Sequence, residues 1–330
     1  MSWKTAQSVS DAWGTCASWA RCAIGASRAR AVLLALGLCA AASAGWGASL
    51  NYCDHPSEPG AGTQDRLIQV AAIVKAELEQ SGHSLALVSR SGLALERLDQ
   101  RYSHAGVSLK ASSNTPWSVR QLYYACDEQR PRIFDQGMAG FVMGANDPAE
   151  GYVSIVLLPP EAAAPIELAA LDDRQALQLL GATYSANAYA FSQRYQNCNQ
   201  WLAELLASAW GQLAPGDDAR SRAQQWLQDA GYAPTVLNVG WRPLMWLADR
   251  LRWLHSDDHP PQDIEATRFR VSMPASIESF VRGRLPEARR IELCYTAQQV
   301  VIRRGWEPIA TGCQPAAGDE VVPLASEATL

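Results

Sequence analysis

The stretch QRYQNCNQWLAELLASAW, Gln193–Trp210, combines a helix start, a cysteine and an apolar stripe, and the fold is predicted outward from it. Asn197 is a favourable residue for capping a helix N-terminus. The small or apolar positions after it recur at the spacing of one helix face, namely Cys198, Leu202, Leu205 and Ala209. The pattern predicts a helix that begins at Cys198 and turns its thiol inward.

Cys198 is a candidate nucleophile because of its place in the first helical turn. A thiol there lies near the positive end of the helix dipole and beside unpaired backbone amides, and both favour the thiolate. The alternative is that Cys198 is a small buried core residue. A histidine within reach of the sulfur would favour the catalytic interpretation.

The composition of the 330-residue chain is that of an ordinary globular protein, with 48% hydrophobic residues. Such a chain can bury the core of one large domain or of two small ones. The formal charge is −5, and the lysines are Lys4, Lys75 and Lys110, so no basic stripe is available for phosphate contacts. The charge pattern therefore argues against nucleic-acid binding.

Residues 1–44 have the pattern of a signal peptide. Scattered positive charges precede an apolar run, which ends in Ala42-Ser43-Ala44, a cleavage motif of small residues. The run is shorter than the roughly 20 residues of a membrane-spanning helix, so a permanent anchor is the second choice. We expect a periplasmic or secreted protein with no stable membrane span after cleavage.

Five of the eight cysteines follow this segment: Cys53, Cys126, Cys198, Cys294 and Cys313. Two disulfides would leave one thiol free in an oxidising compartment, and we expect Cys198 to be that thiol. Cys294 and Cys313 flank a predicted hairpin and are expected to pair. A bond between Cys53 and Cys126 then completes the set, although the sequence leaves the other connectivities open.

His104 is the one histidine that stands within a predicted strand, near residues 102–107. Alternation divides the strand into an apolar face and a histidine face, with Ala105, Val107 and Leu109 on the first and His104, Gly106 and Ser108 on the second. The small residues beside His104 would allow close approach of a helix. We therefore expect the cysteine helix to pack on the histidine face, with His104 as the base.

A catalytic imidazole usually needs a polar partner that fixes its orientation. Gln121, on a strand predicted over 117–126, is the first choice, and Asp127 and Asp135 are the alternatives.

The start of the cysteine helix also predicts an oxyanion site. The backbone amide of Cys198 is the expected donor, with the side chain of Asn199 or Gln200 as a second donor. Tyr195 is expected to line the cleft.

The remaining predicted elements surround these residues. Helices are expected over 64–80, 93–101, 167–180, 219–230, 242–253 and 276–282. Strands are expected over 83–90, 132–137, 151–158, 290–294 and 299–303, and the tail 315–330 is expected to be poorly ordered.

The run His255-Ser256-Asp257-Asp258-His259 has side chains that could bind a metal. The pair Pro260-Pro261 follows at once and favours a solvated loop over a helix. No metal and no organic cofactor is therefore expected.

The order of these motifs resembles the circularly permuted branch of the NlpC/P60 papain-like thiol hydrolases. The strand LALVSR, the strand YSHAGV, the strand YVSIVLLP and the helix opened by YQNCNQW carry the resemblance. It implies that His104 is the base, that Cys198 is the nucleophile and that a third polar residue, here Gln121, lies on the strand after the histidine.

The resemblance also implies a fold. We expect an α+β, papain-like domain in permuted order over 45–212, with a small antiparallel sheet packed on the cysteine helix. Residues 213–330 would form a helical and hairpin extension packed on that domain.

Over its whole length the chain is similar to an uncharacterised family of exported proteobacterial proteins, domain of unknown function 2145. The shared blocks are YSHAG, RYQNCNQW and SMP-x-SIE, the last at Ser272–Glu278. This second resemblance implies no activity.

The function expected from these observations is that of an exported cysteine hydrolase or acyltransferase. It would cleave or transfer an acyl group at an amide or ester bond in a peptidoglycan peptide, an envelope protein or a lipid. The alternative, from a different class, is a non-catalytic envelope module that binds an unknown ligand in the same cleft.

Overall fold

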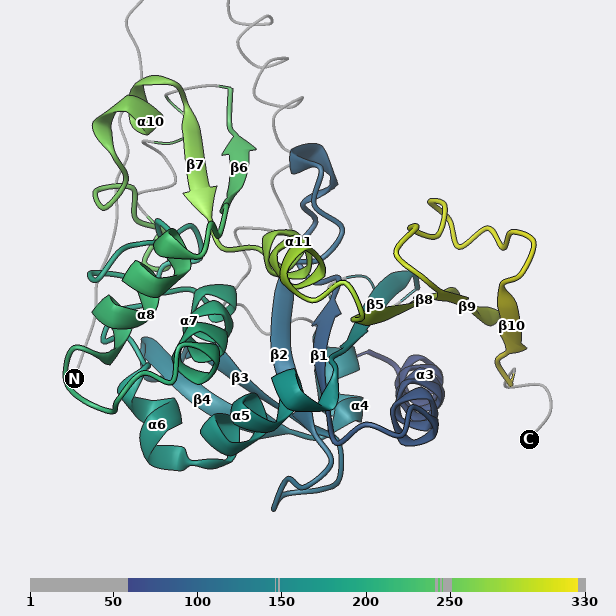
Figure 1. Cartoon of the computed structure of the whole chain (residues 1–330). Coiled ribbons are helices and arrows are strands. Elements are labelled where there is room, and N and C mark those ends of the chain that lie inside the picture. Colours follow the sequence, from purple (N-terminus) through teal and green to yellow (C-terminus); the bar gives the residue numbers. More distant parts are fainter. Residues whose placement is uncertain are drawn as a thin grey trace, which may run out of the picture. The chain divides into compact units, whose positions relative to one another are not determined.

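The centre of the fold is an eight-stranded antiparallel sheet with the order β10-β9-β8-β5-β1-β2-β3-β4 (Figure 1). The structure is a computed structural model, and it describes residues 59–325 except 146, 148, 241, 242, 244 and 246–250. The predicted signal peptide, 1–44, lies outside the described residues.

The bounds of the elements follow from the backbone. The strands of the main sheet are β1 Leu85–Arg90, β2 His104–Leu109, β3 Ser118–Ala125, β4 Arg130–Gln136, β5 Gly151–Leu157, β8 Arg289–Tyr295, β9 Gln299–Arg304 and β10 Glu320–Pro323, and a separate hairpin pairs β6 Thr235–Asn238 with β7 Arg268–Val271. The helices are α3 Ala61–Gln80, α4 Met138–Met143, α5 Pro160–Leu171, α6 Asp173–Gln178, α7 Cys198–Trp210, α8 Ala219–Asp229, α10 Pro261–Glu265 and α11 Pro274–Arg284.

Helices cover both faces of the central strands. On one face, α5 and α7 form an apolar cluster with inward side chains of β1, β2 and β3. On the other face, α3 and α4 form a second cluster with the alternate side chains of β1 and β3 and with side chains of β5 (Figure 1). Every residue of β1 and β2 is therefore buried, which explains why LALV at the start of β1 is a continuous apolar run and not an alternating one.

The sheet is larger than the small sheet that we expected. Strands β8, β9 and β10 come from the predicted C-terminal extension, and β8 pairs with β5 along its full length. The described residues belong to one compact unit. The fold is mixed α+β, as predicted. The full extent of the sheet was not predicted, because β5 and β8 are paired strands that are far apart in sequence.

Most predicted elements are present, three differ from expectation, and the helix expected over 242–253 lies mostly outside the described residues. The helix expected over 167–180 is two helices, because Asp172 ends α5 and its side chain accepts the amides of Arg174 and Gln175 at the start of α6. The helix expected over 93–101 is only the 3-10 turn Glu96–Leu98, which ends at Asp99 in a left-handed conformation. The tail expected to be disordered contains β10.

Within the part of the chain that the structure describes, no helix is both long enough and apolar enough to cross a membrane.

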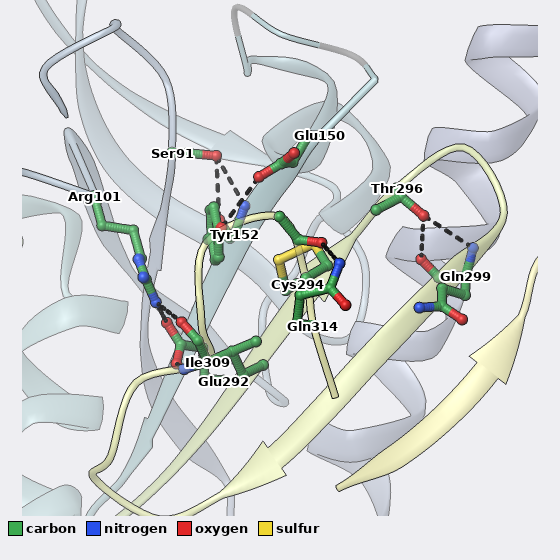
Figure 2. Close-up of a disulfide and its surroundings, with 12 residues drawn as sticks. Ser91, Arg101, Glu150, Tyr152, Glu292, Cys294, Thr296, Gln299, Ile309 and Gln314 are labelled. Carbon is green, nitrogen blue, oxygen red and sulfur yellow. Dashed lines mark hydrogen bonds and ion pairs between the residues drawn. A yellow bond between two sulfur atoms is a disulfide. The ribbon is translucent and has the colours of Figure 1, made fainter. Parts of the chain in front are cut away.

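A disulfide between Cys294 and Cys313 ties the loop after β9 to β8, as predicted (Figure 2). Nearby, Arg101 donates hydrogen bonds to Glu292 at 2.9 Å and to the carbonyl of Ile309 at 2.8 Å. These contacts connect the disulfide region to the segment that enters β2, because Arg101 stands just before that strand.

Replacing both Cys294 and Cys313 by Ser should lower the free energy of unfolding by about 3 kcal/mol, because the bond restricts the unfolded chain over a separation of 19 residues. Urea denaturation monitored by tryptophan fluorescence measures this. The control for reactions of the remaining free thiol is wild-type protein that has been unfolded and refolded and in which this thiol has then been alkylated. Equal stability of the double variant and the wild type would contradict the prediction.

Candidate functional site

The helix α7 begins where the sequence predicts, at Cys198. The side-chain oxygen of Asn197 accepts the amide of Gln200 at 2.7 Å, which is an N-cap hydrogen bond. The side-chain nitrogen of Asn197 donates to the carbonyls of Ala186 and Ser272, both at 3.3 Å. The N-cap is thus fixed to two other segments, and the first helical turn has a defined position.

A buried carboxylate, Glu204, fixes the next turn of α7. Arg220 of α8 pairs with it at 2.9 Å, and the side-chain amides of Gln196, Gln200 and Gln224 donate to it at 2.6, 3.1 and 2.6 Å. The Gln200 amide also donates to the carbonyl of Ser192. Gln200, which we expected beside the oxyanion, therefore has its amide hydrogens directed at the helix and the preceding loop.

Asn199 connects the cysteine helix to the histidine strand. Its side-chain nitrogen donates to the carbonyl of Ser103 at 3.1 Å. Ser103 immediately precedes His104, and Asn199 immediately follows Cys198, so the backbones of the two predicted catalytic residues lie at the same end of β2. Asn199 acts here as a positioning contact, while its own oxygen is buried without a hydrogen-bond partner among the described residues.

Cys198 is the free thiol of the described residues, as the cysteine count predicts. Cys126 is disulfide-bonded, and Cys53, its predicted partner, lies outside the described residues. Only 6% of Cys198 is exposed, and it belongs to the apolar cluster beneath α7.

Burial controls the charge of this thiol. It raises the pKa of Cys198 to about 11, although the amides of Asn199 and Cys198, the charge of Arg90 and the hydroxyl of Tyr184 favour the thiolate. The expectation that the helix start makes a thiolate is therefore wrong for this structure, because loss of hydration outweighs the dipole and the amides. The thiol is protonated at neutral pH.

His104 has the partner that we predicted. Its Nε2 donates to the side-chain oxygen of Gln121 at 2.6 Å, and the Gln121 nitrogen donates to Gln136 at 2.8 Å. The alternative Asp135 instead binds Arg120. Burial, followed by the charge of Arg90, lowers the pKa of His104 to about 3, so the imidazole is neutral at neutral pH.

Contrary to our expectation, the cysteine helix does not pack on the face of β2 that carries the imidazole. The imidazole ring contacts Tyr123, with centroids 4.9 Å apart, and Phe141 of α4, at 6.2 Å. The sulfur of Cys198 instead lies with the cluster of Ala105 on the opposite face. Among the hydrogen bonds of the described residues, none joins Cys198 to His104.

Gly106 lies against the neighbouring strand β3 and not against the cysteine helix. A Cβ at Gly106 would lie 2.6 Å from the side chain of Val119 and 3.1 Å from that of Gln121. The space beside His104 is thus filled by side chains of the neighbouring strand β3, and the apolar face receives α7. Small residues on a strand mark close approach, but the sequence does not say of which element.

Tyr195, the predicted cleft residue, is covered by the loop that we expected to be solvated. The rings of Tyr195 and His255 stack with centroids 4.4 Å apart and an angle of 12°. His259 is buried and donates from Nε2 to the carbonyl of Asn187 at 2.7 Å, so the loop is packed against the approach to α7. His259 serves structure in this arrangement.

A cavity of about 430 Å³ opens near the start of β2. It is lined by Ser91, Gly92, Leu93, Ala94, Glu96, Asp99, Gln100, Arg101, Asp147, Glu150, Gly151, Tyr152 and Thr311. The hydroxyl of Ser103 accepts the amide of Leu93 in its wall at 3.0 Å. Ser103 therefore contacts both the cavity wall and Asn199. No sequence motif indicated this cavity.

Residues 77–281 match a family described as an uncharacterized protein conserved in bacteria, DUF2145. The chain belongs to this family. The DUF2145 match contains Cys198, His104 and Gln121 and ends before β8. No curated protein and no solved structure matches the chain.

His104→Gln should weaken the pH dependence of stability. Because the pKa of His104 is lower in the folded than in the unfolded chain, the unfolded chain alone binds a proton between pH 6.5 and 3, and stability falls as the pH falls. The wild type should lose about 2 kcal/mol between pH 7 and 5 from this residue, and the variant should not. Urea denaturation at both pH values measures the difference, and equal losses in the two proteins would refute it.

Glu204→Ala should lower the free energy of unfolding by about 3–5 kcal/mol, because Arg220 would remain buried without its carboxylate. Glu128→Ala is the matched control, since Glu128 pairs with Arg132 at the surface. Thermal and urea denaturation of both variants provide the measurement. A Glu204→Ala protein as stable as the control would show that the buried pair does not hold α7.

Proposed function

We propose that the protein is an exported cysteine hydrolase or acyltransferase that acts on an amide or ester bond in the bacterial envelope. One observation carries the proposal. A free thiol at a helix start is connected, through Asn199 and Ser103, to the end of a strand where an imidazole is oriented by Gln121.

The reaction would follow from the hydrogen bonds of these residues. Gln121 holds Nε2 of His104, so Nδ1 is the nitrogen that can accept the thiol proton. The sulfur of Cys198 attacks the carbonyl carbon, and the resulting oxyanion accepts hydrogen bonds from the first backbone amides of α7. Nδ1 then returns the proton to the leaving group, and water or an acceptor releases the acyl group.

The proposed chemistry requires that substrate binding exposes Cys198 and brings His104 to it. Cys198 is buried and protonated, and the imidazole of His104 lies on the other face of β2. The side chain of His104 has to turn toward the end of the strand, where the carbonyl of Ser103 already meets Asn199. Hydration of the opened site would lower the pKa of the thiol and raise that of the imidazole.

The order of the elements supports a papain-like site in permuted order. The histidine strand β2 precedes the cysteine helix α7, and the orienting glutamine lies on β3, the strand after the histidine. This is the arrangement implied by the resemblance to the permuted NlpC/P60 hydrolases.

The compartment narrows the substrate class. Disulfides persist in oxidising compartments, the family is bacterial, and residues 1–44 have the pattern of an export signal. We therefore propose a periplasmic or secreted enzyme whose substrate is a peptidoglycan peptide, an envelope protein or a lipid acyl group.

A second candidate function is a non-catalytic envelope module that binds an unknown ligand. The observation that favours it is the raised pKa of Cys198, since a thiol with a pKa of about 11 is a poor nucleophile at neutral pH.

Acylation by p-nitrophenyl acetate tests the catalytic proposal. We expect intact-mass spectrometry of the folded protein to show an acetyl adduct on Cys198, no adduct in Cys198→Ser, and formation roughly 100-fold slower in His104→Gln. Acylation at the same rate in His104→Gln, or its absence from the wild type, would favour the non-catalytic module.

A further inference from the structure

Another cavity lies between helix α11 and the loop that follows α8. Its volume is about 350 Å³, which is within the range of sites for small ligands. It is lined by Ala230, Gly231, Ala233, Ser276, Ser279, Phe280, Gly283 and Arg284. Apart from Phe280 and Arg284, no lining side chain is larger than that of serine, so the cavity exists because its walls carry small residues.

The two walls of this cavity are fixed to each other. The hydroxyls of Tyr232 and Ser276 are hydrogen-bonded at 2.9 Å, and this bond joins the loop after α8 to α11. The ring of Phe280 packs edge-on against Tyr232, with centroids 5.5 Å apart, and against Trp226 of α8, at 6.3 Å. The cavity is therefore preformed, and a ligand does not have to order its walls.

Arg284 places a positive charge at this cavity. Its guanidinium lies over the ring of Trp226, 4.8 Å from the centroid, and 5.9 Å from the ring centroid of Trp210. Among the hydrogen bonds and ion pairs of the described residues, none includes Arg284. A cation in the last turn of a helix stabilises it through the helix dipole, and Arg284 stands in that turn. Contact with two indole rings in addition restricts the guanidinium, whose planar set of N–H groups matches the two oxygens of a carboxylate.

The loop wall offers a main-chain donor. The amides of Ala230, Gly231 and Tyr232 donate to carbonyls of α8, whereas the amide of Ala233 donates to no protein acceptor among the described residues. A carbonyl of an extended ligand can accept this amide. The small side chains of Ala230 and Ala233 leave room beside it for a small apolar group.

We propose that this cavity binds the C-terminal carboxylate of a peptide whose last residue is small, such as alanine. Arg284 pairs with the carboxylate, the hydroxyl of Ser279 donates to it, and the amide of Ala233 donates to a peptide carbonyl. A peptide suits the cavity better than a carboxylated sugar, because Trp226, whose ring a sugar could cover, is already covered by Arg284 and Phe280.

This cavity is separate from the candidate catalytic site. Trp210, which Arg284 contacts, is the last residue of α7 and lies roughly 18 Å along the helix from Cys198, at about 1.5 Å per residue. The inference therefore goes beyond the proposed function and does not depend on it. Peptide binding and acylation by p-nitrophenyl acetate can each succeed or fail without the other.

Fluorescence anisotropy of a labelled peptide tests the inference. The probe is the peptide Gly-Gly-Ser-Ala-Ala with fluorescein at its N-terminus and a free C-terminal carboxylate, and the control is the same peptide with a C-terminal amide. We expect the protein to bind the acid and to bind the amide roughly tenfold or more weakly, because the amide lacks the charge-assisted pair with Arg284. Equal affinity for the two peptides, or binding of neither, would overturn the inference, and binding of tetragalacturonate alone would assign the cavity to a sugar instead.

Variants separate this cavity from the net charge of the protein. Arg284→Gln should weaken binding of the acid roughly tenfold or more, while Arg289→Gln, which removes an exposed cation at the start of β8, should leave it unchanged. Gly283→Leu should block binding, because a Cβ at Gly283 has nothing within 4 Å and the longer side chain occupies the cavity. Leucine also favours a helix more than glycine does, so this variant should keep its fold, which circular dichroism checks. A folded Gly283→Leu protein that binds the acid like the wild type would rule out this cavity, and equal losses in Arg284→Gln and Arg289→Gln would reduce the effect to net charge.

Discussion

The constraint on which this structure depends is the burial of its central strands on both faces. Helices α3 and α4 cover one face and α5 and α7 the other, so a polar side chain on β1, β2 or β3 is removed from water wherever it points. Each such group has to find a partner inside the protein, because an unpaired buried polar group costs a large part of the net stability of a domain.

Two buried clusters satisfy this requirement with paired charges. Glu204 is surrounded by Arg220 and by side-chain amides that converge on α7. Glu292 accepts from Tyr102, from Arg101 and from the amide of Ile309, and Arg290 balances its charge. These clusters fix the cysteine helix on one side and the approach to β2 on the other.

The third cluster, Arg90 with His104 and Gln121, is different because its cation has no carboxylate partner among the described residues. It lies where the approach to β2 and the start of α7 meet, at the hydrogen bond between Asn199 and Ser103. Two networks with paired charges therefore flank a site whose cation has no carboxylate partner among the described residues. That contrast, more than the presence of a cysteine and a histidine, marks this end of the sheet as the candidate for chemistry.

What the sequence determined by itself is local. Spacing and capping act over short distances, and they predict the N-cap at Asn197, the helix from Cys198 and the strand with His104. Spacing and the cysteine count, by elimination, predict the pairing of Cys294 with Cys313 and the free state of Cys198. The hydrogen bond of Gln121 to His104 could also be predicted, because neighbouring strands of a hairpin place their side chains together. Only the tertiary structure decided which face of β2 receives α7, how far the sheet extends through β8, and that Arg90 stands opposite His104 with no carboxylate partner among the residues the structure describes. These features depend on packing between distant segments and on loss of hydration, and neither leaves a periodic signal in the chain.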